Sequence, residues 1–133
     1  MRDKEWDPDR CRELRRTERE IVRVLKKERA KETRAKNTIS DIRGQLSRLH
    51  EFLSKLKDKL SIVVATDILQ RRPSPKQALL LAEMANARAA ISQLYDKRRI
   101  AEVTLEGHRN ALEDFRRSRQ ANAAEMNALN CFG

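Results

Sequence analysis

The chain has 133 residues, of which 38% are charged and only 4% are aromatic. So few aromatic residues among so many charges argue against a wide layered core, and sustained apolar heptads distinguish a long helix from a disordered chain. The formal net charge is +10, from 30 basic and 20 acidic residues. A surface of this charge attracts nucleic acids, anionic lipids and acidic proteins alike, so charge by itself does not identify the partner.

The first helix is predicted to begin at residue 8, after a frayed N-terminus over residues 1–7. Asp7 suits the N-cap, Pro8 suits the first helical position, and Asp9 places negative charge at the positive end of the helix dipole. No apolar run follows a basic start, so no secretory signal is indicated, and no segment approaches the ~20 apolar residues that span a bilayer. We therefore expect a soluble protein of a reducing compartment.

Alternating three- and four-residue spacings organise residues 39–63. This pattern places apolar side chains on one narrow stripe, which is typical of a coiled-coil seam. It extends to residues 11 and 67, and no proline interrupts residues 9–72, so one helix of ~90 Å is predicted over residues 8–70. The seam positions are Cys11, Leu14, Glu18, Ile21, Leu25, Glu28, Glu32, Ala35, Ile39, Ile42, Leu46, Leu49, Leu53, Leu56, Leu60, Val63 and Asp67.

A short break over residues 71–74 ends this helix. Pro73 disfavours helix at the residue before it, whereas Ser74, Pro75 and Gln77 suit the N-cap, the first helical position and the third position of a capping box. A second heptad pattern predicts a helix over residues 75–130. A break this short returns the second helix antiparallel to the first. The second seam comprises Leu80, Met84, Ala87, Ile91, Leu94, Arg98, Ala101, Leu105, His108, Leu112, Phe115, Arg119, Asn122, Met126 and Leu129.

The predicted fold is therefore all-α, a single antiparallel two-helix coiled-coil hairpin over residues 8–130. Folding it about residue 73 makes the numbers of facing residues add to roughly 146. Glu28 then lies near Arg119, and we expect a seam ion pair that determines the register. Cys11 and Cys131 also come close at the open end of the hairpin. In a reducing compartment this proximity is a coincidence, because a disulfide requires oxidising conditions.

No pattern of catalytic, cofactor-binding or metal-binding residues is recognisable. Three scattered glycines form no phosphate-binding loop, and the two cysteines form no metal-ligand motif. His108 is expected on the seam as a partly buried neutral imidazole, and His50 flanks Leu49. Two paired helices offer no concave pocket in which acids and serines converge, so we expect no enzymatic activity and no cofactor.

Basic residues gather at the open end and form the first candidate binding surface. In one interpretation they are a solvated face with salt bridges to Glu13, Glu20 and Glu113. In the other they form a basic plug for an acidic or phosphate-bearing partner. Nucleic acid is not expected, because no aromatic residues interleave with the arginines to stack on bases. The candidate residues are Arg10, Arg12, Arg15, Arg16, Arg19, Arg23, Arg116, Arg117 and Arg119.

The second candidate surface lies beside the turn, within the apolar run of residues 78–82. Leu80 is in register with the seam, whereas Leu79 and Leu81 point away from it. The two surplus leucines either cap the tip of the hairpin or form a docking patch for another protein.

The second half of the chain resembles the stalk proteins of bacterial type III secretion. These are the FliJ-like component of flagellar export and its YscO-like and InvI-like injectisome counterparts. The similar segment reads SPKQALLL over residues 74–81, ARAAISQL over residues 87–94 and LEDFR over residues 112–116. The resemblance covers roughly residues 74–119 by pattern and the remainder by architecture.

The resemblance implies a non-catalytic central stalk that couples a hexameric secretion ATPase to a membrane export gate, peripheral to the bacterial inner membrane, with a possible role in handling secretion chaperones. It implies that the nine open-end arginines enter the ATPase ring. It further implies that Leu79, Leu80, Leu81 and Glu83 face the export-gate membrane protein. Two alternatives stay open: a coiled-coil scaffold whose seam pairs with another chain, and a basic helical protein that binds nucleic acid.

Overall fold

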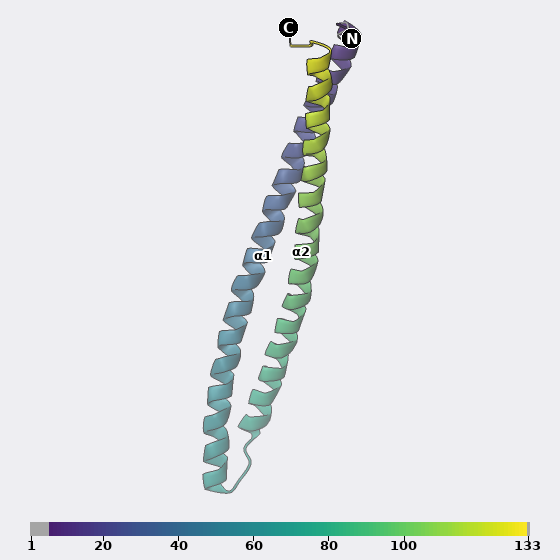
Figure 1. Cartoon of the computed structure of the whole chain (residues 1–133). Coiled ribbons are helices and arrows are strands. Elements are labelled where there is room, and N and C mark those ends of the chain that lie inside the picture. The colour runs from purple at the N-terminus through teal and green to yellow at the C-terminus, as the bar shows by residue number, and fades with distance from the viewer. Residues whose placement is uncertain (1–5, 133) are drawn as a thin grey trace. The chain divides into compact units, whose positions relative to one another are not determined.

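The structure, a computed structural model that describes residues 6–132, consists of two α-helices in an antiparallel hairpin (Figure 1). Helix α1 spans Pro8–Gln70 and helix α2 spans Pro75–Ala128. Residues 6–132 contain no strand. The all-α hairpin is therefore confirmed, and α2 ends two residues earlier than predicted. Most of the predicted frayed N-terminus lies outside the described residues, although Trp6 and Asp7 do precede the helix.

The start of α1 follows the prediction. One carboxylate oxygen of Asp7 accepts hydrogen bonds from the backbone N–H groups of Asp9 and Arg10, both at 3.1 Å. The Asp7 carbonyl accepts from the backbone N–H of Cys11 at 2.9 Å. These are the bonds of an N-cap residue, which satisfies amide groups that have no partner within the helix.

The connection between the helices is built around Asp67. Arg71 has a φ of 51°, and the backbone N–H of Arg72 donates to the Asp67 carbonyl at 3.0 Å, so α1 ends in a left-handed turn. The Asp67 carboxylate then accepts from the Ser74 backbone N–H at 3.1 Å, the Ser74 hydroxyl at 3.0 Å and the Gln77 side-chain amide at 2.6 Å. The predicted capping box is wrong, because Gln77 reaches across to α1 instead of back to Ser74.

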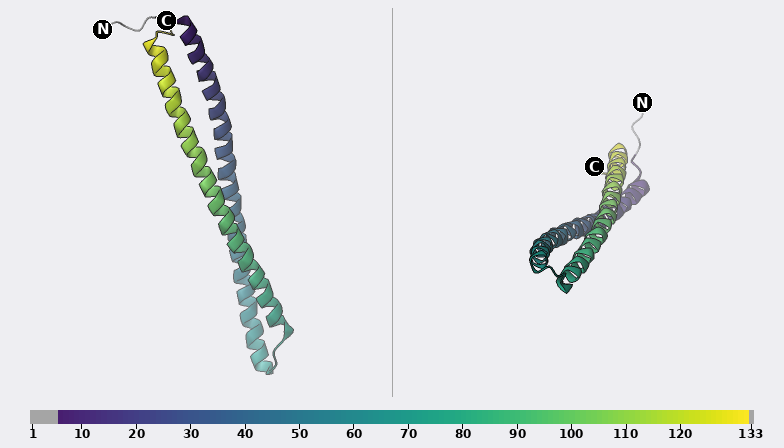
Figure 2. Two further views of the ribbon diagram at one scale, coloured as in Figure 1. Left: turned by 90° about the vertical axis from the view of Figure 1, so that its right-hand side faces the viewer. Right: turned by 90° about the horizontal axis from the view of Figure 1, so that it is seen from below.

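This arrangement makes the connection run back along α1 before α2 begins, as Figure 1 shows. The two further views in Figure 2 show the chain reversing direction at the same place. Asp67 is only 7% exposed, yet its carboxylate has three hydrogen-bond donors. Burial raises the pKa of Asp67, but the bonds from Gln77 and Ser74 outweigh it and hold that pKa below its ordinary value.

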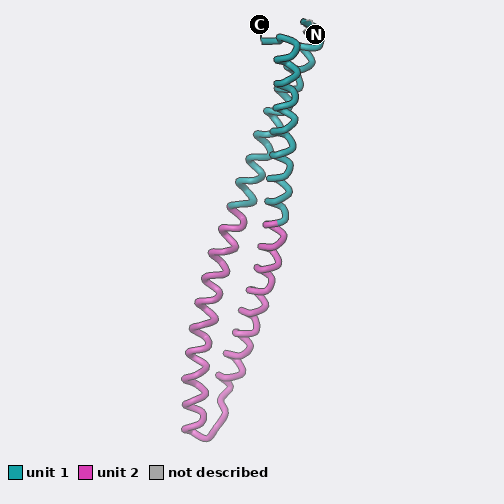
Figure 3. Tube along the Cα trace, viewed as in Figure 1, with its two compact units in different colours: residues 1–36, 103–133 teal, residues 37–102 magenta. Residues whose placement is uncertain are grey.

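The chain divides into two compact units, coloured separately in Figure 3. Unit 1 comprises residues 1–36 and 103–133, and unit 2 comprises residues 37–102. Each unit contains a segment of α1 and a segment of α2.

Unit 2 has one continuous apolar core. Its buried residues come from seam positions on both helices, and Leu49, Leu60 and Leu80 pack against them half-buried. The buried members are Ile42, Leu46, Leu53, Leu56, Met84, Ala87, Ile91 and Leu94.

Unit 1 has two smaller apolar clusters. One contains Ile21, Leu25 and Leu112 with Phe115 packed against it. The other contains Cys11, Leu14, Met126, Leu129 and Cys131. All predicted seam residues of α1 are buried or half-buried, and so are those of α2 except Arg119, so the predicted seams are confirmed by burial.

The predicted register is wrong in unit 1. Glu28 does not pair with Arg119; its carboxylate lies 2.9 Å from Nδ1 of His108, about three turns of α2 before Arg119. Arg119 instead pairs with Glu18, with Nε 2.7 Å from the carboxylate. Folding about residue 73 also assumed that α2 begins level with the end of α1. Ser74 in fact lies beside Asp67, about one turn before that end.

Candidate functional site: two binding surfaces

All nine arginines predicted to form the first surface lie in unit 1 and are exposed. Several are held by neighbouring acids. Arg10 pairs with Glu125 at 2.9 Å and with Glu13 at 3.0 Å, and these hydrogen bonds, led by that of Glu125, raise its pKa. Arg12 pairs with Asp9, and Arg117 pairs with Glu113 at 3.5 Å. Salt bridges therefore engage part of this surface, as the first interpretation expected for Glu13 and Glu113.

A hollow of about 310 Å³ lies on one flank of unit 1. It is lined by Arg29, Arg116, Arg119 and Gln120 over an apolar floor of Leu25 and Ala123. The charges of Arg109 and Arg116 also contribute, after the bond from Lys36, to lowering the pKa of Glu32. This is a basic concavity in which an anionic group of a partner could be held by planar guanidinium groups.

Sequence reasoning missed Arg29 and Arg109, although a signal for them exists. Arg29 follows seam residue Glu28, Arg109 follows His108, and Arg116 follows Phe115. Residues that immediately follow a seam position line the same flank of an antiparallel pair. Reading the flank positions of both helices together would have placed these three arginines on one face.

Glu28 and His108 form a half-buried polar contact within the unit 1 seam. Their side chains are 14% and 23% exposed, and Lys31 approaches the same carboxylate at 3.4 Å. The hydrogen bond from His108 is the main cause of a lowered Glu28 pKa; burial opposes it, and Lys31 adds to the lowering. The half-buried position predicted for His108 is confirmed.

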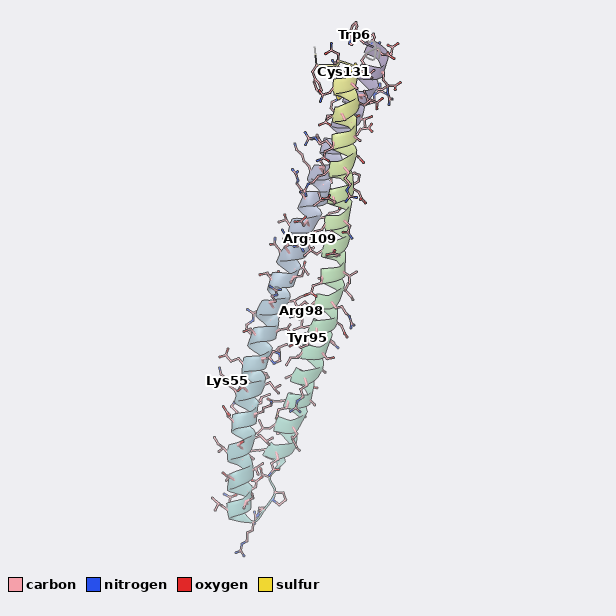
Figure 4. All side chains as sticks on the ribbon, viewed as in Figure 1. Trp6, Lys55, Tyr95, Arg98, Arg109 and Cys131 are labelled. Atoms are coloured by element: carbon pink, nitrogen blue, oxygen red, sulfur yellow. A yellow bond between two sulfur atoms is a disulfide. The ribbon has the colours of Figure 1, made fainter. Side chains whose placement is uncertain are left out.

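The open end of unit 1 is closed by a disulfide between Cys11 and Cys131, which are 120 residues apart in sequence. Asn130 has a φ of 60°, and the Cys131 backbone N–H donates to the Met126 carbonyl at 2.9 Å, so the chain turns back after α2. Figure 4 labels Cys131 at this end. The interpretation of their proximity as a coincidence is wrong, because the left-handed turn at Asn130 directs Cys131 against Cys11.

The same end is tied by two further contacts. The Arg15 guanidinium donates to the Cys131 carbonyl at 2.8 Å. The side-chain amide of Asn122, a buried seam residue, donates to the Leu14 carbonyl at 2.9 Å. Arg15, one of the predicted binding arginines, therefore also holds the C-terminal turn in place.

The second candidate surface, beside the turn in unit 2, is strongly apolar. Leu79 is 64% exposed and Leu81 is 51% exposed, whereas Leu80 is half-buried and Glu83 is exposed. The exposed leucines do not cap the tip of the hairpin, so that interpretation is wrong. Three further exposed side chains near the turn were not predicted: Ile62, Ile68 and Leu69, at 67%, 69% and 84%. The sequence contained a signal for this exposed surface, because Ile62 and Leu69 lie seven residues apart and both fall outside the seam.

One flank of this surface is hollowed into an open groove of about 380 Å³. Its walls are Lys59, Ile62 and Val63 from α1 and Lys76, Leu79, Leu80 and Glu83 from α2. Three of the four residues predicted for this surface therefore line a single groove, and Leu81 lies outside its lining.

A polar cluster elsewhere in unit 2 involves Tyr95 and Arg98, which are labelled on α2 in Figure 4. The Tyr95 hydroxyl lies 3.2 Å from Nε2 of His50, and the Arg98 guanidinium lies over the Tyr95 ring at 5.3 Å. His50 thus contacts α2 as a neighbour of the seam.

Comparison with known proteins returned no family model, no curated protein and no solved structure that matches this chain. Among residues 6–132, no group of three or more His, Cys, Asp and Glu side chains is placed to hold a metal ion. Within the same part of the chain, neither helix is long and apolar enough to cross a membrane.

Proposed function

We propose that this chain is a non-catalytic helical hairpin that couples two partners, as the central stalk of a type III secretion ATPase complex. The arginine surface of unit 1 would bind the hexameric ATPase, and the apolar surface beside the turn would bind the export gate. The observation that carries the proposal is the strong exposure of large aliphatic side chains beside the turn, since monomeric proteins rarely expose apolar residues in such groups without a partner.

The filled seam supports this proposal over the scaffold alternative. A scaffold that assembles through its seam needs seam residues that are not already covered. Here the seam residues of α1 pack against those of α2 within each unit. The apolar surface that is left for a partner lies outside the seam, at Ile62, Leu79 and their neighbours.

The charge of unit 1 suits an acidic partner surface. Exposed arginines accelerate and orient encounter with an acidic surface, and they contribute more to association rate than to affinity. Arg16, Arg19 and Arg23 are exposed on α1, and Arg116 lines the hollow on α2. Binding of this kind should weaken as salt concentration rises.

The disulfide sets a condition on this proposal. A stalk in the bacterial cytoplasm would work with Cys11 and Cys131 as thiols, because that compartment keeps cysteines reduced. Reduction frees the Cys131 turn, to which Arg15 donates a hydrogen bond. We therefore expect the ATPase to bind the reduced form at least as well as the oxidised form.

The test is capture of partners from lysate of the native organism with the full chain as bait, in reduced and oxidised forms, identified by mass spectrometry. We expect a hexameric ATPase and export-gate subunits. Replacing Arg15, Arg16, Arg116 and Arg117 by alanine should lower ATPase recovery about tenfold, because four exposed charges are lost from one surface.

The matched control replaces four exposed basic residues of unit 2, Arg43, Lys57, Arg88 and Arg99, by alanine. It removes the same charge and should leave ATPase recovery within about twofold of the wild type. Equal losses in both variants would show that only net charge matters and would refute the surface assignment. Recovery of other coiled-coil proteins without an ATPase would favour the scaffold, and salt-sensitive binding to an oligonucleotide would favour the nucleic-acid alternative.

A further inference from the structure

The groove beside the turn in unit 2 makes the apolar face of the hairpin wider than a two-helix seam requires. Two paired helices need apolar residues only at seam positions, whereas three packed helices need a broader apolar face on each. Ile62 and Leu79 lie one residue before seam positions Val63 and Leu80, and they are 67% and 64% exposed. Ile62 and Val63 form the apolar part of the groove wall on α1. Leu79 and Leu80 form the apolar part of the wall on α2.

The two flanks of α1 in unit 2 differ in composition. Residues that precede a seam position include Phe52, Lys55, Lys59 and Ile62, and Phe52 is 47% exposed. Away from the turn, the residues that follow a seam position include Ser47, His50, Ser54, Lys57 and Ser61, and apolar residues occur on this flank only beside the turn, at Val64 and Ile68. Away from the turn, exposed apolar side chains therefore continue only on the flank formed by residues that precede seam positions. A further helix would cover that flank of α1.

The groove flank is also basic. Lys59 and Lys76 line the groove from opposite helices, and Glu83 is its one acidic lining residue. Farther from the turn, Arg48 and Lys55 on α1 and Lys97 on α2 also directly precede seam positions. Among these three, the ion pairs of the described residues include only that of Lys55, with Glu51 at 3.5 Å. An apolar strip bordered by positive charge is complementary to an apolar strip bordered by negative charge.

We propose that this groove binds an amphipathic α-helix of a partner protein, whose apolar stripe is flanked by acidic residues, to complete a three-helix contact in unit 2. The partner's apolar side chains pack against Ile62, Leu79 and Phe52. Its carboxylates face Lys59 and Lys76. A helix fits better than an extended peptide, because neither α1 nor α2 offers a strand edge and both present residues at helical spacing.

This inference deepens the proposed function, since it names the class of element that the surface beside the turn binds. It does not depend on the arginines of unit 1. Failure of ATPase capture through those arginines would therefore leave the groove untested, and failure of the groove would leave the arginine surface standing.

The experiment uses two synthetic four-heptad peptides with the same leucine stripe, one flanked by glutamates and the other by lysines. Binding to the full chain is measured by fluorescence anisotropy at low and high salt. We expect the glutamate-flanked peptide to bind about tenfold more tightly than the lysine-flanked peptide, with the difference shrinking as salt rises. Equal affinities, or no binding of either peptide up to ~100 µM, would overturn the proposal.

The matched variants are Leu79→Ser and Leu81→Ser, which remove exposed leucines on opposite sides of Leu80. Leu79→Ser should weaken binding of the glutamate-flanked peptide about tenfold, because it removes an exposed apolar side chain from the lining of the groove. Leu81 does not line the groove, so Leu81→Ser should change the affinity for the glutamate-flanked peptide less than about twofold. Circular dichroism checks that both variants keep the helix content of the wild type.

The remaining arm tests a membrane as the occupant, with vesicles of phosphatidylcholine and phosphatidylserine. Basic and apolar side chains at a helix end also suit an anionic bilayer surface. If the chain sediments with these vesicles, and Leu79→Ser and Leu81→Ser reduce sedimentation equally while the peptides do not bind, the tip inserts into lipid and the helix proposal is wrong. No sedimentation, together with peptide binding that depends on Leu79 alone, supports the helix.

Discussion

The two units of this hairpin use the same heptad pattern but are held together by different interactions. Unit 2 is joined by eight buried apolar residues in one continuous core. In unit 1 the seam is interrupted by Glu18, Glu28, His108 and Arg119, and the apolar residues fall into two clusters. Apolar side chains can pack against many different apolar neighbours, whereas ion pairs, hydrogen bonds and a disulfide form only between particular residues. Unit 2 is therefore held mainly by apolar packing, whereas unit 1 is held by specific polar pairs and a covalent bond.

The largest expected effect comes from the disulfide that closes unit 1. Reduction, or the double change Cys11→Ser and Cys131→Ser, should lower the free energy of unfolding by about 4 kcal/mol, because the bond closes a loop of more than 100 residues in the unfolded chain. The measurement is urea denaturation with and without reductant. Hydrogen exchange should accelerate most in residues 8–20 and 120–132. An unchanged midpoint, or acceleration mainly in unit 2, would contradict this account.

The next effect compares the two apolar cores directly. Leu56 in unit 2 and Leu25 in unit 1 are each 2% exposed. Leu56→Ala should cost about 3 kcal/mol, because it opens a cavity in a continuous core. Leu25→Ala should cost about 2 kcal/mol, because its cluster is smaller and borders the open hollow beside Arg116, where neighbouring side chains can relax. Denaturant titration of both variants checks the order, and a larger loss for Leu25→Ala would reverse the comparison.

A smaller effect is expected at one glycine in each unit. A methyl group added at Gly44 in unit 2 or at Gly107 in unit 1 meets no atom within 4 Å. Alanine should therefore stabilise each helix by about 0.5–1 kcal/mol through its higher helix propensity alone. The gain should be the same in both units, as read from thermal unfolding. Unequal gains would mean that one of the two helices is not continuous in solution.

The smallest effect concerns the Glu28–His108 contact of unit 1. The folded-state pKa of Glu28 is lowered, mainly by the hydrogen bond from His108, so its contribution to stability is present above the ordinary carboxyl value of 4.5 and is lost as pH falls through the lowered value. Glu28→Gln should slightly lower the unfolding temperature at pH 7.

The difference in unfolding temperature between Glu28→Gln and the wild type should shrink as pH falls below 4.5. Glu20→Gln, which alters an exposed acid on the same helix, is the control and should show no such trend. A difference that is constant from pH 7 to pH 3 would remove the Glu28–His108 contact from the account of register.

Much of the fold could be read from residue spacing. The burial of the two seams, the N-cap at Asp7 and the break at residues 71–74 all depend on neighbours within a few residues, where helical geometry is invariant. The exposed Leu79 and Leu81 were found in the same way, as surplus apolar residues outside a seam. Their neighbours Ile62 and Leu69 were missed, although their seven-residue spacing outside the seam is visible within α1 alone.

What spacing did not determine is which residues face each other across the hairpin. Heptads repeat every seven residues, so α2 can slide along α1 by whole heptads and still bury its seam. The choice was made at tertiary contacts: Asp67 binding Ser74 and Gln77, Glu28 meeting His108, and Cys131 turned back onto Cys11 by Asn130. The sequence by itself determined that two amphipathic helices form and reverse direction, because those events are local. Only the tertiary structure decided their register, because it depends on contacts between residues that are far apart in the chain.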